Sequence, residues 1–337
     1  MKKRHVFIKT APARISYNEM KANAKGLLRM GSDKHISLAG IMGFPVTPFH
    51  DSEQVDEKAF EANVRFLLDN GLDSIFVCAG SGEYQSLDLQ EYEQLVSTGV
   101  STVTGQVPVF AGVGGNVKEA VERAQLAERL GADGLLLLPP YLIIPEQEGL
   151  YQYYRTIAQS TDLSVIIYQR DNAIFTLSTI EKLASLPNVI GFKDGLGNFE
   201  LNIEFVQSLG SKLQWMNGMP LAELTMPAYA ALGYHSYSSA ISNYMPQVSR
   251  KFYESLLGGD QAFVQTLYRE VLLPIHRIRQ LRKGYAVSLI KAGMDIVGLP
   301  IGLSVRPPLV RVEREHYVLL ESIIKRSIDL IAISNKG

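Results

Sequence analysis

The chain has 337 residues, a hydrophobic content of 46% and a formal net charge of −1. This length is ample for one large α/β barrel or for two or three smaller domains, and the near-neutral charge gives no electrostatic support for binding nucleic acid. The single cysteine, Cys78, excludes an internal disulfide and a cluster of cysteine metal ligands, and it is typical of a reducing compartment.

The first 40 residues differ from the rest of the chain in charge. They hold nine basic residues against two acidic ones, a net charge of +7, so the remainder carries about −8. No apolar region of a secretory signal follows the basic start, and no stretch approaches the ~18 apolar residues of a membrane span. We interpret residues 1–40 as a solvated arm or an oligomer contact. A tail for nucleic acid or an anionic surface is the alternative, with little support from aromatic interleaving.

From residue 41 onward, short apolar runs alternate with longer amphipathic stretches. The runs are apolar nearly throughout, as expected of parallel strands that are buried on both faces. The last two runs are weaker by composition. The predicted strands cover 41–47, 74–78, 108–112, 134–138, 164–168, 189–193, 213–216 and 235–239.

Helical periodicity and helix-ending residues mark the stretches between these strands. Apolar residues recur at helical spacing, and glycine or proline follows several of the stretches. Eight strands, each followed by a helix, favour a closed (β/α)8 TIM barrel over 41–258 rather than an open doubly wound sheet. The helices with predicted bounds cover 56–70, 117–130, 176–185, 201–209, 221–232 and 245–257.

The chain continues beyond the eighth helix as a C-terminal helical appendage over 259–337. Helices are predicted over 260–281, 285–296 and 311–332. The segment 298–309, GLPIGLSVRPPL, is rich in glycine and proline and is predicted to be irregular.

Barrel enzymes place their chemistry at the carboxyl ends of the strands, which narrows the search for a site. The second strand leads into AGSGE (79–83), where small residues expose backbone N–H groups and Ser81 adds a hydroxyl. Such a loop suits a carboxylate or a phosphate, and a simple glycine turn is the alternative. The third strand leads into GVGGN (112–116), which lacks the spacing of a dinucleotide-binding loop.

The fourth, fifth and sixth strands end in residues that can transfer protons or act as nucleophiles. Tyr141 follows the fourth strand, and Tyr168 ends the fifth, where amphipathic packing is the ordinary role of a tyrosine. Lys193 ends the sixth, where a lysine ordinarily extends its ammonium group into water. At the catalytic rim of a barrel, a desolvated lysine instead supplies a free amine that attacks a ketone.

Other chemistries find less support in the sequence. It contains no HExxH, P-loop or G-x-S-x-G motif, and its six histidines are scattered. A metal-dependent barrel would need several acidic or histidine side chains at the strand ends, where mainly Glu83 and Asp194 are found. We therefore predict no metal and no cofactor other than a covalent imine on Lys193.

Several segments resemble the dihydrodipicolinate synthase/N-acetylneuraminate lyase superfamily over residues 40–310. The pairing of a tyrosine on strand five with a lysine on strand six is the most specific element. Within the superfamily, IGFKDGLGNFE (190–200), KGYAVSLIKAGMDIVG (283–298) and VRPPL (305–309) are similar to the 5-dehydro-4-deoxyglucarate dehydratases, as is Arg170 in place of a proline. The more general motifs are GFPVTPF (43–49), AGSGE (79–83), GADGLLLLPPYL (131–142), VIIYQR (165–170) and GFKDG (191–195).

The resemblance implies a mechanism and a set of site residues. Lys193 forms a Schiff base with a 2-keto acid, Tyr168 transfers protons, and loss of water and CO2 gives 2,5-dioxopentanoate. It also implies a cytoplasmic homotetramer whose only partner besides its own copies is the small-molecule substrate. The implied binding residues are Gly80, Ser81 and Gly82 for the keto-acid carboxylate, Arg170 for the second carboxylate, Ser239 and Asn243 at the same end, and Tyr141 near a neighbouring subunit.

Departures from the family pattern concern the substrate rather than the imine chemistry. Gly80 and Ser81 replace a pair of threonines, Gln169 replaces an asparagine, and Leu221 stands where a hydroxyl residue is usual. An aldolase or lyase that cleaves or condenses pyruvate on the same barrel is the nearest alternative. A non-catalytic relative that binds a keto acid is the alternative of a different class.

Overall fold

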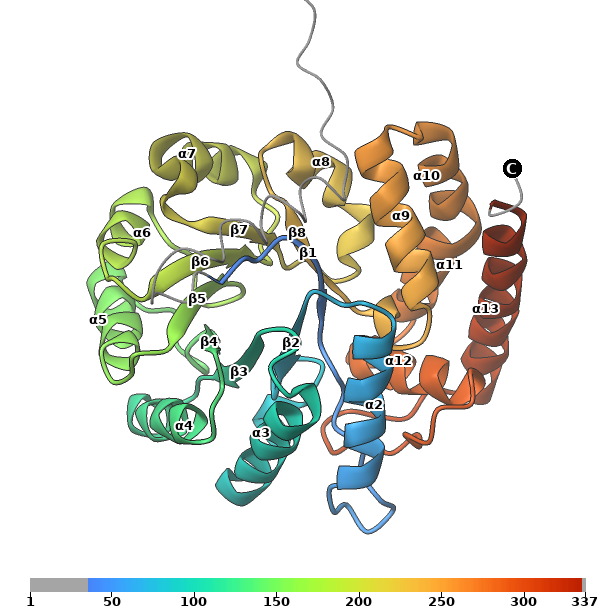
Figure 1. The fold of residues 1–337 in the computed structure, drawn as a ribbon, viewed down its shortest axis with the longest axis horizontal. Coiled ribbons are helices and arrows are strands. Elements are labelled where there is room, and N and C mark those ends of the chain that lie inside the picture. The colour runs from blue at the N-terminus through green and yellow to red at the C-terminus, as the bar shows by residue number, and fades with distance from the viewer. Residues whose placement is uncertain (1–35, 335–337) are drawn as a thin grey trace, which may run out of the picture.

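The computed structural model describes residues 36–334, which form a closed parallel barrel ringed by helices (Figure 1). Each strand pairs with its neighbours in the sequence, and β8 closes the barrel against β1. The predicted TIM barrel is confirmed, including its two compositionally weak last strands. The strands are β1 (Gly40–Gly43), β2 (Ser74–Val77), β3 (Val109–Val113), β4 (Gly134–Leu137), β5 (Ser164–Gln169), β6 (Val189–Asp194), β7 (Gln214–Asn217) and β8 (Ser236–Ser239).

Each strand is followed by a helix that covers the outside of the barrel. Several helices begin at a side-chain cap, because Asp56, Asp88, Asn116 and Asn198 each accept a hydrogen bond from a backbone N–H of the first turn. These helices are α2 (Glu57–Asp69), α3 (Leu89–Val103), α4 (Val117–Arg129), α5 (Gln147–Ala158), α6 (Leu177–Leu183), α7 (Phe199–Leu209), α8 (Met226–Ala231) and α9 (Pro246–Gly258).

Three predicted boundaries differ from the structure for local reasons. The first strand ends at Gly43 instead of residue 47, because Pro45 and Pro48 have no N–H to donate to the neighbouring strand. The predicted helix over 221–232 consists of a short 3-10 turn (Ala222–Leu224) followed by α8. The predicted helix over 260–281 is divided into two α-helices by a π-helical turn (Tyr268–Leu272).

The helices α10 (Gln261–Leu267), α11 (Leu273–Gln280), α12 (Tyr285–Ile296) and α13 (Arg314–Ser334) follow the barrel and are called the C-terminal extension. They pack against one another and against α9 on one side of the barrel (Figure 1). The 298–309 segment between α12 and α13 has no regular secondary structure, as predicted. The predicted basic arm over 1–40 lies outside the described residues except for residues 36–40.

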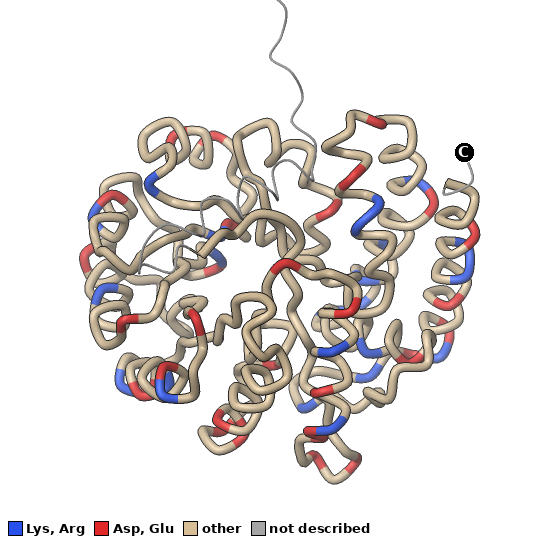
Figure 2. The backbone as a smooth tube through the Cα atoms, viewed as in Figure 1, with Lys and Arg blue, Asp and Glu red and all other residues tan. Residues whose placement is uncertain are grey.

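Apolar side chains fill two separate layers. The larger layer lies between the strands and the surrounding helices. The smaller layer fills the barrel interior and includes Phe44, Phe76 and Phe110, whose rings stack with centroids 4.6 and 4.7 Å apart, next to Tyr168. Figure 2 shows most charged positions on the outer helices. Lys193 and Asp194 on β6 are therefore unusual, since both are buried at a strand end.

Candidate active site

Lys193 lies at the carboxyl end of β6, opposite Tyr168 on β5. Its side chain lines a cavity of about 1480 Å³, yet the residue is only 4% exposed. The Nζ atom lies 4.0 Å from the ring centre of Phe44 and 4.4 Å from that of Tyr168. Within residues 36–334 it forms no ion pair with a carboxylate. The strand-end lysine is thus enclosed by aromatic rings instead of reaching into water.

This environment favours the neutral amine of Lys193. Burial lowers its pKa well below the usual value, and the positive charge of Arg170 lowers it further. A neutral primary amine has the lone pair that attack on a carbonyl carbon requires. The site therefore places an amine that is able to act as a nucleophile opposite the phenol of Tyr168.

The Tyr168 hydroxyl is held between two polar groups. It donates to the backbone carbonyl of Gly218 at 3.3 Å and accepts from Nη1 of Arg170 at 3.2 Å. Burial raises its pKa, whereas the nearby Arg170 guanidinium acts in the opposite direction. The phenol accordingly rests in its protonated form, and Arg170 is placed to stabilise a phenolate while a proton is in transit.

Two glycines leave room for this pair of side chains. A Cβ at Gly195 would lie 2.9 Å from the Tyr168 hydroxyl oxygen, and a Cβ at Gly218 would lie 2.6 Å from Cγ of Lys193. Both positions require the absence of a side chain because the catalytic candidates already occupy the space. The GFKDG motif thus ends in a glycine for a packing reason.

Asp194 anchors the loop that follows β6 and does not line the cavity. Its Oδ1 accepts from Gln169 Nε2 at 3.0 Å, and its Oδ2 accepts from Asn202 Nδ2 at 2.8 Å and from the hydroxyl of Tyr229. Backbone N–H groups of Leu196 and Gly197 also donate to it. The Asp194 carboxylate thus links the end of β6 to β5 and α7, which fixes the position of the adjacent Lys193 along the barrel axis.

The Gly80–Ser81–Gly82 segment divides into an accessible part and a buried turn. Gly80 and Ser81 line the cavity, whereas the Gly82 carbonyl accepts from Oγ1 of Thr47 at 2.7 Å. The backbone N–H groups of all three residues take no part in the turn and loop hydrogen bonds formed among residues 36–334. Free N–H groups beside a cavity suit an anionic ligand, and the role of the segment in binding a carboxylate stays a prediction.

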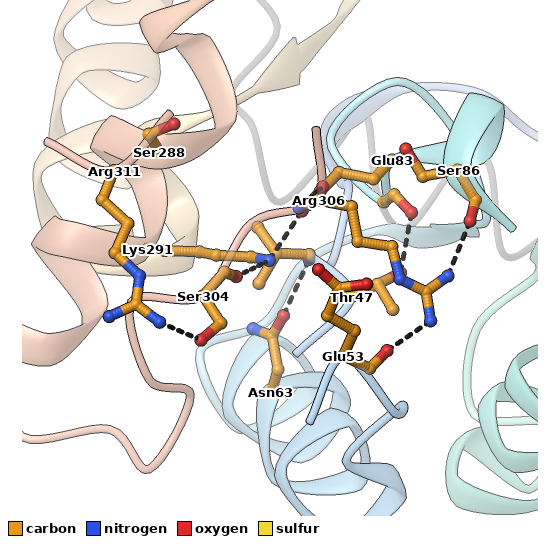
Figure 3. A network of polar contacts seen from close by, with 12 residues as sticks. Thr47, Glu53, Asn63, Glu83, Ser86, Ser288, Lys291, Ser304, Arg306 and Arg311 are labelled. Carbon is orange, nitrogen blue, oxygen red and sulfur yellow. Dashed lines mark hydrogen bonds and ion pairs between the residues drawn. The ribbon is translucent and has the colours of Figure 1, made fainter. Parts of the chain in front are cut away.

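A buried ion pair between Lys291 and Glu83 supports the loop that contains this segment (Figure 3). Lys291 on α12 donates to Oε1 of Glu83 at 2.6 Å and to the Ser304 carbonyl at 2.6 Å, and both side chains of the ion pair are fully buried. The backbone N–H of Arg306 donates to the other oxygen of Glu83 at 3.1 Å. Glu83 is therefore committed to protein contacts.

Arg306 extends the same network toward the loop after β2. Its guanidinium donates to both carboxylate oxygens of Glu91, at 2.7 and 2.5 Å, and to the carbonyls of Ser86 and Glu53. Lys291 and Arg306 thus attach the C-terminal extension to the 80–83 loop. They belong to the segments KGYAVSLIKAGMDIVG and VRPPL, for which the resemblance alone gave no physical role.

The four remaining predicted binding residues occupy four different settings. Arg170 lines the cavity with a side chain that is 37% exposed, and its Nε contacts Asp171 at 3.2 Å. Ser239 lines the cavity but donates to the buried Glu223 at 2.6 Å. Asn243 does not line the cavity, because its amide bonds the Phe44 and Ala240 carbonyls and the Asn63 side chain. Tyr141 lies at the rim and is 78% exposed.

The structure adds cavity residues that sequence reasoning missed. Phe44 is part of the quoted GFPVTPF segment, but only the structure places its ring against Lys193. Arg279 on α11 reaches the cavity from the C-terminal extension. The rule that barrel chemistry lies at the strand ends does not point to it. Leu221, which the sequence already marks as a departure from the family pattern, lines the cavity with a left-handed backbone, at φ 56°. Its apolar side chain adds no hydroxyl at this position.

Two features of the described residues bear on other functions. Across 36–334, no three His, Cys, Asp or Glu side chains come together in a way that would hold a metal ion. No helix among those residues is both long and apolar enough to cross a membrane. Cys78 is buried at the end of β2, and burial raises the pKa of its thiol.

The sequence matches the Dihydrodipicolinate synthetase family over residues 37–327. It is 58% identical to a probable 5-dehydro-4-deoxyglucarate dehydratase of Oceanobacillus iheyensis, over 86% of this chain and 94% of that protein. It is 55% identical to a protein of the same name from Bacillus subtilis, with the same two coverages. The resemblance expected from the motifs is confirmed.

Solved structures with the same fold are more distant in sequence. The dihydrodipicolinate synthase of Oceanobacillus iheyensis is 27% identical, with a TM-score of 0.80 over 86% of this chain and 96% of that one. The prophage protein YagE of E. coli K12, of the dihydrodipicolinic acid synthase family and solved in complex with pyruvate, is 25% identical, with a TM-score of 0.77 over 86% and 98%.

Proposed function

Because the chain belongs to the Dihydrodipicolinate synthetase family, we propose that it is a 5-dehydro-4-deoxyglucarate dehydratase that works through an imine on Lys193. The identity of 55–58% to proteins named as probable dehydratases, over almost their whole length, supports the substrate. The observation that carries the mechanism is the buried Lys193 amine, without an ion-pair partner in residues 36–334, opposite Tyr168.

The reaction begins when the Lys193 amine attacks carbon 5, the ketone carbon next to the carbon 6 carboxylate. Tyr168 donates its proton to the departing carbinolamine hydroxyl, which leaves as water and yields a protonated imine. The resulting phenolate is stabilised by the Arg170 guanidinium, whose Nη1 lies 3.2 Å away. The positively charged imine then acidifies the hydrogens on carbon 4.

The second stage removes the hydroxyl of carbon 3. The Tyr168 phenolate takes a proton from carbon 4, and the electron pair moves toward the imine nitrogen to give an enamine. As that electron pair returns, the carbon 3–oxygen bond breaks and Tyr168 protonates the departing hydroxyl, which leaves as water. The product is a conjugated imine with a double bond between carbons 3 and 4.

The third stage releases the far carboxylate as CO2. The carbon 1–carbon 2 bond breaks, and its electrons pass through the conjugated chain to the imine nitrogen. Protonation at carbon 4, ketonisation of the carbon 2 enol and hydrolysis of the imine then give 2,5-dioxopentanoate and free Lys193. The overall reaction consumes one proton and releases one water and one CO2.

Binding of the substrate is divided between two ends of the cavity. The free N–H groups of the Gly80–Ser81–Gly82 segment hold the carbon 6 carboxylate, and Arg170 holds the far carboxylate. The hydroxyl of Ser239 is occupied by Glu223 and Ser242, and the amide of Asn243 is occupied by backbone carbonyls, so these two residues support the cavity wall at this end. No metal and no cofactor beyond the covalent imine take part in these steps.

The enzyme is further proposed to be a cytoplasmic homotetramer. The loop after β4 presents Tyr141, Leu142, Ile143 and Ile144, which are 65–84% exposed. Contiguous exposed apolar residues are typical of an interaction surface. Contact with a second copy of the chain would bury this loop and place Tyr141 beside a neighbouring cavity.

A pyruvate-dependent aldolase or synthase is the second candidate function. Its support is the fold shared with dihydrodipicolinate synthases and with a relative solved in complex with pyruvate. Arg170, with its charge at the cavity wall, favours the keto diacid instead. The non-catalytic alternative finds no support, since Lys193 and Tyr168 are both present and adjacent.

The deciding experiment incubates the full chain with 5-dehydro-4-deoxyglucarate and follows CO2 release together with 2,5-dioxopentanoate. The proposal expects equal amounts of both and none from Lys193→Ala. Pyruvate and an aldehyde as products would instead establish the lyase. Undiminished product from Lys193→Ala would contradict the imine mechanism.

A further inference from the structure

The C-terminal extension places one guanidinium in the cavity whose role the proposed mechanism leaves open. Arg279 lies in the last turn of α11, and its side chain lines the cavity together with Lys193 and Arg170. It is partly buried. Among residues 36–334, no side chain or backbone group forms a hydrogen bond or an ion pair with its guanidinium. Its five N–H donors are available to a ligand.

Arg279 and Arg170 line the same cavity from different parts of the fold, Arg279 from α11 and Arg170 from the end of β5. The positive charge of Arg170 lowers the pKa of Arg279, after the larger effect of burial, and it also lowers that of Lys193. The nearest acidic partner of Arg170 is Asp171, an exposed side chain adjacent in sequence. Arg170 and Arg279 bring two positive charges to the cavity against the one exposed carboxylate of Asp171, so positive charge is in excess around these two guanidiniums.

The remaining acidic residues of the cavity wall come from another sector of the barrel. Asp88 caps α3, and Glu119 and Glu122 belong to α4. They accompany Arg123, whose guanidinium stacks over the rings of Tyr84 and Tyr92. No carboxylate within residues 36–334 forms an ion pair with Arg279. The positive charge on its side of the cavity is therefore open to an anionic ligand.

We infer that Arg279 and Arg170 together form the subsite for the far carboxylate of a dicarboxylic 2-keto acid. The inference rests on the proposed function for the identity of the substrate, but the subsite itself needs only a keto acid with a second carboxylate. A carboxylate offers four lone-pair positions, enough for two guanidiniums, and such charge-assisted pairs are stronger than neutral ones. The C-terminal extension thereby selects the substrate.

The role of the subsite follows from the fate of this carboxylate. It is an anion in the bound substrate and in the dehydration step, but it becomes neutral CO2 in the last step. Contacts with two guanidiniums therefore stabilise the bound substrate at least as well as the transition state of decarboxylation. Such contacts lower KM without raising kcat. Arg279 is accordingly expected to set affinity and selectivity for the diacid.

The test compares two keto acids of equal length that cannot lose water. 2-Oxoadipate carries a carboxylate at the far end, and 2-oxohexanoate carries a methyl group there. Each is incubated with the full chain and borohydride, and the rate of covalent labelling of Lys193 is measured at subsaturating concentration. The ratio of the two rates reports the far-end subsite alone. It does not depend on dehydratase turnover.

We expect wild type to prefer 2-oxoadipate and Arg279→Met to lose about tenfold or more of that preference, as the loss of roughly one charge-assisted contact implies. Arg279→Lys retains the charge without the planar fork and should lose less. Arg277→Met, on the same helix but exposed and outside the cavity lining, is the matched control and should behave as wild type.

Two results would overturn the inference. One is an unchanged preference in Arg279→Met. The other is an equal fall in labelling by both keto acids, which would indicate a structural role. If Arg279→Met does not fold, Arg279→Lys takes its place. A wild-type preference for 2-oxoadipate in that variant, which lacks the guanidinium, would also contradict the inference. Absence of 2,5-dioxopentanoate with intact 2-oxoadipate preference would contradict the dehydratase but leave the subsite standing.

Discussion

Two fully enclosed lysines in this protein have opposite surroundings. Lys193 on β6 contacts aromatic rings and forms no ion pair with a carboxylate within residues 36–334. Lys291 on α12 donates to Glu83 and to the Ser304 carbonyl, each at 2.6 Å. Burial lowers the pKa of both, but the Glu83 carboxylate opposes that effect at Lys291.

The difference indicates how the fold assigns two roles to one residue type. A buried lysine with a carboxylate and a carbonyl acceptor keeps its proton and acts as a structural cation. A buried lysine without such partners releases its proton and becomes a nucleophile. Burial alone therefore does not distinguish the proposed catalytic lysine from a structural one; the presence or absence of a carboxylate partner does. Exchanging or removing partners should interconvert the two behaviours.

The largest expected effect is on turnover. Replacing Lys193 with alanine removes the amine that forms the imine, so kcat should fall by about 10³-fold or more, equivalent to roughly 4 kcal/mol of transition-state stabilisation. The circular dichroism spectrum should remain close to that of wild type, which shows that the variant still folds. Residual turnover near the wild-type value would show that another group carries the chemistry.

Loss of Lys291 should act on stability. Lys291→Met leaves the buried Glu83 carboxylate without its main partner, and we expect a decrease of about 3–5 kcal/mol in the free energy of unfolding, measured in urea. The double variant Lys291→Met with Glu83→Leu removes both charges and should recover much of that loss. Equal destabilisation of the single and double variants would contradict the role of the ion pair.

Placing an acid beside Lys193 should make it resemble Lys291. Phe44→Glu puts a carboxylate near Nζ, which now lies 4.0 Å from the Phe44 ring centre. An opposite charge at such a distance raises the pKa of the lysine, so labelling by pyruvate and borohydride at pH 7 should slow by about tenfold or more. Phe44→Gln is the matched neutral control. The idea fails if both variants show the same pH profile.

The smallest expected effect is a difference in how stability depends on pH. The folded-state pKa of Lys193 is lowered, whereas the unfolded chain has an ordinary lysine pKa of about 10.4. Between these values the unfolded state binds the extra proton, so the free energy of unfolding rises with pH, by at most about 1.4 kcal/mol per pH unit. Lys193→Met should lose this contribution. Identical urea midpoints of wild type and variant from pH 7 to 9 would contradict it.

The sequence predicts the barrel well because its signals are local and repeated. The topology is predicted from apolar runs typical of strands buried on both faces, from helix caps and from the count of eight strand–helix units. Lys193 and Tyr168 follow from the rule that strand ends carry the chemistry, and their pairing in register is confirmed. Adjacent parallel strands bring such residues together without further information.

The other site residues depend on long-range placement that local patterns do not contain. Arg279 reaches the cavity only because the C-terminal extension packs beside the barrel. The Glu83–Lys291 contact joins residues 208 positions apart. Asn243, a polar residue that follows a strand, is predicted from the resemblance to bind substrate. Its side-chain amide instead donates to the backbone carbonyls of Phe44 and Ala240 and does not face the cavity.

The most direct test of the proposed mechanism is to find which lysine forms the imine. Wild-type protein is incubated with pyruvate, reduced with borohydride, digested and mapped by mass spectrometry. The account predicts one stable adduct, on Lys193, with Lys291 unmodified and with no adduct in Lys193→Ala. An adduct on Lys291 or another lysine, or no adduct on Lys193 in the folded wild-type protein, would contradict it.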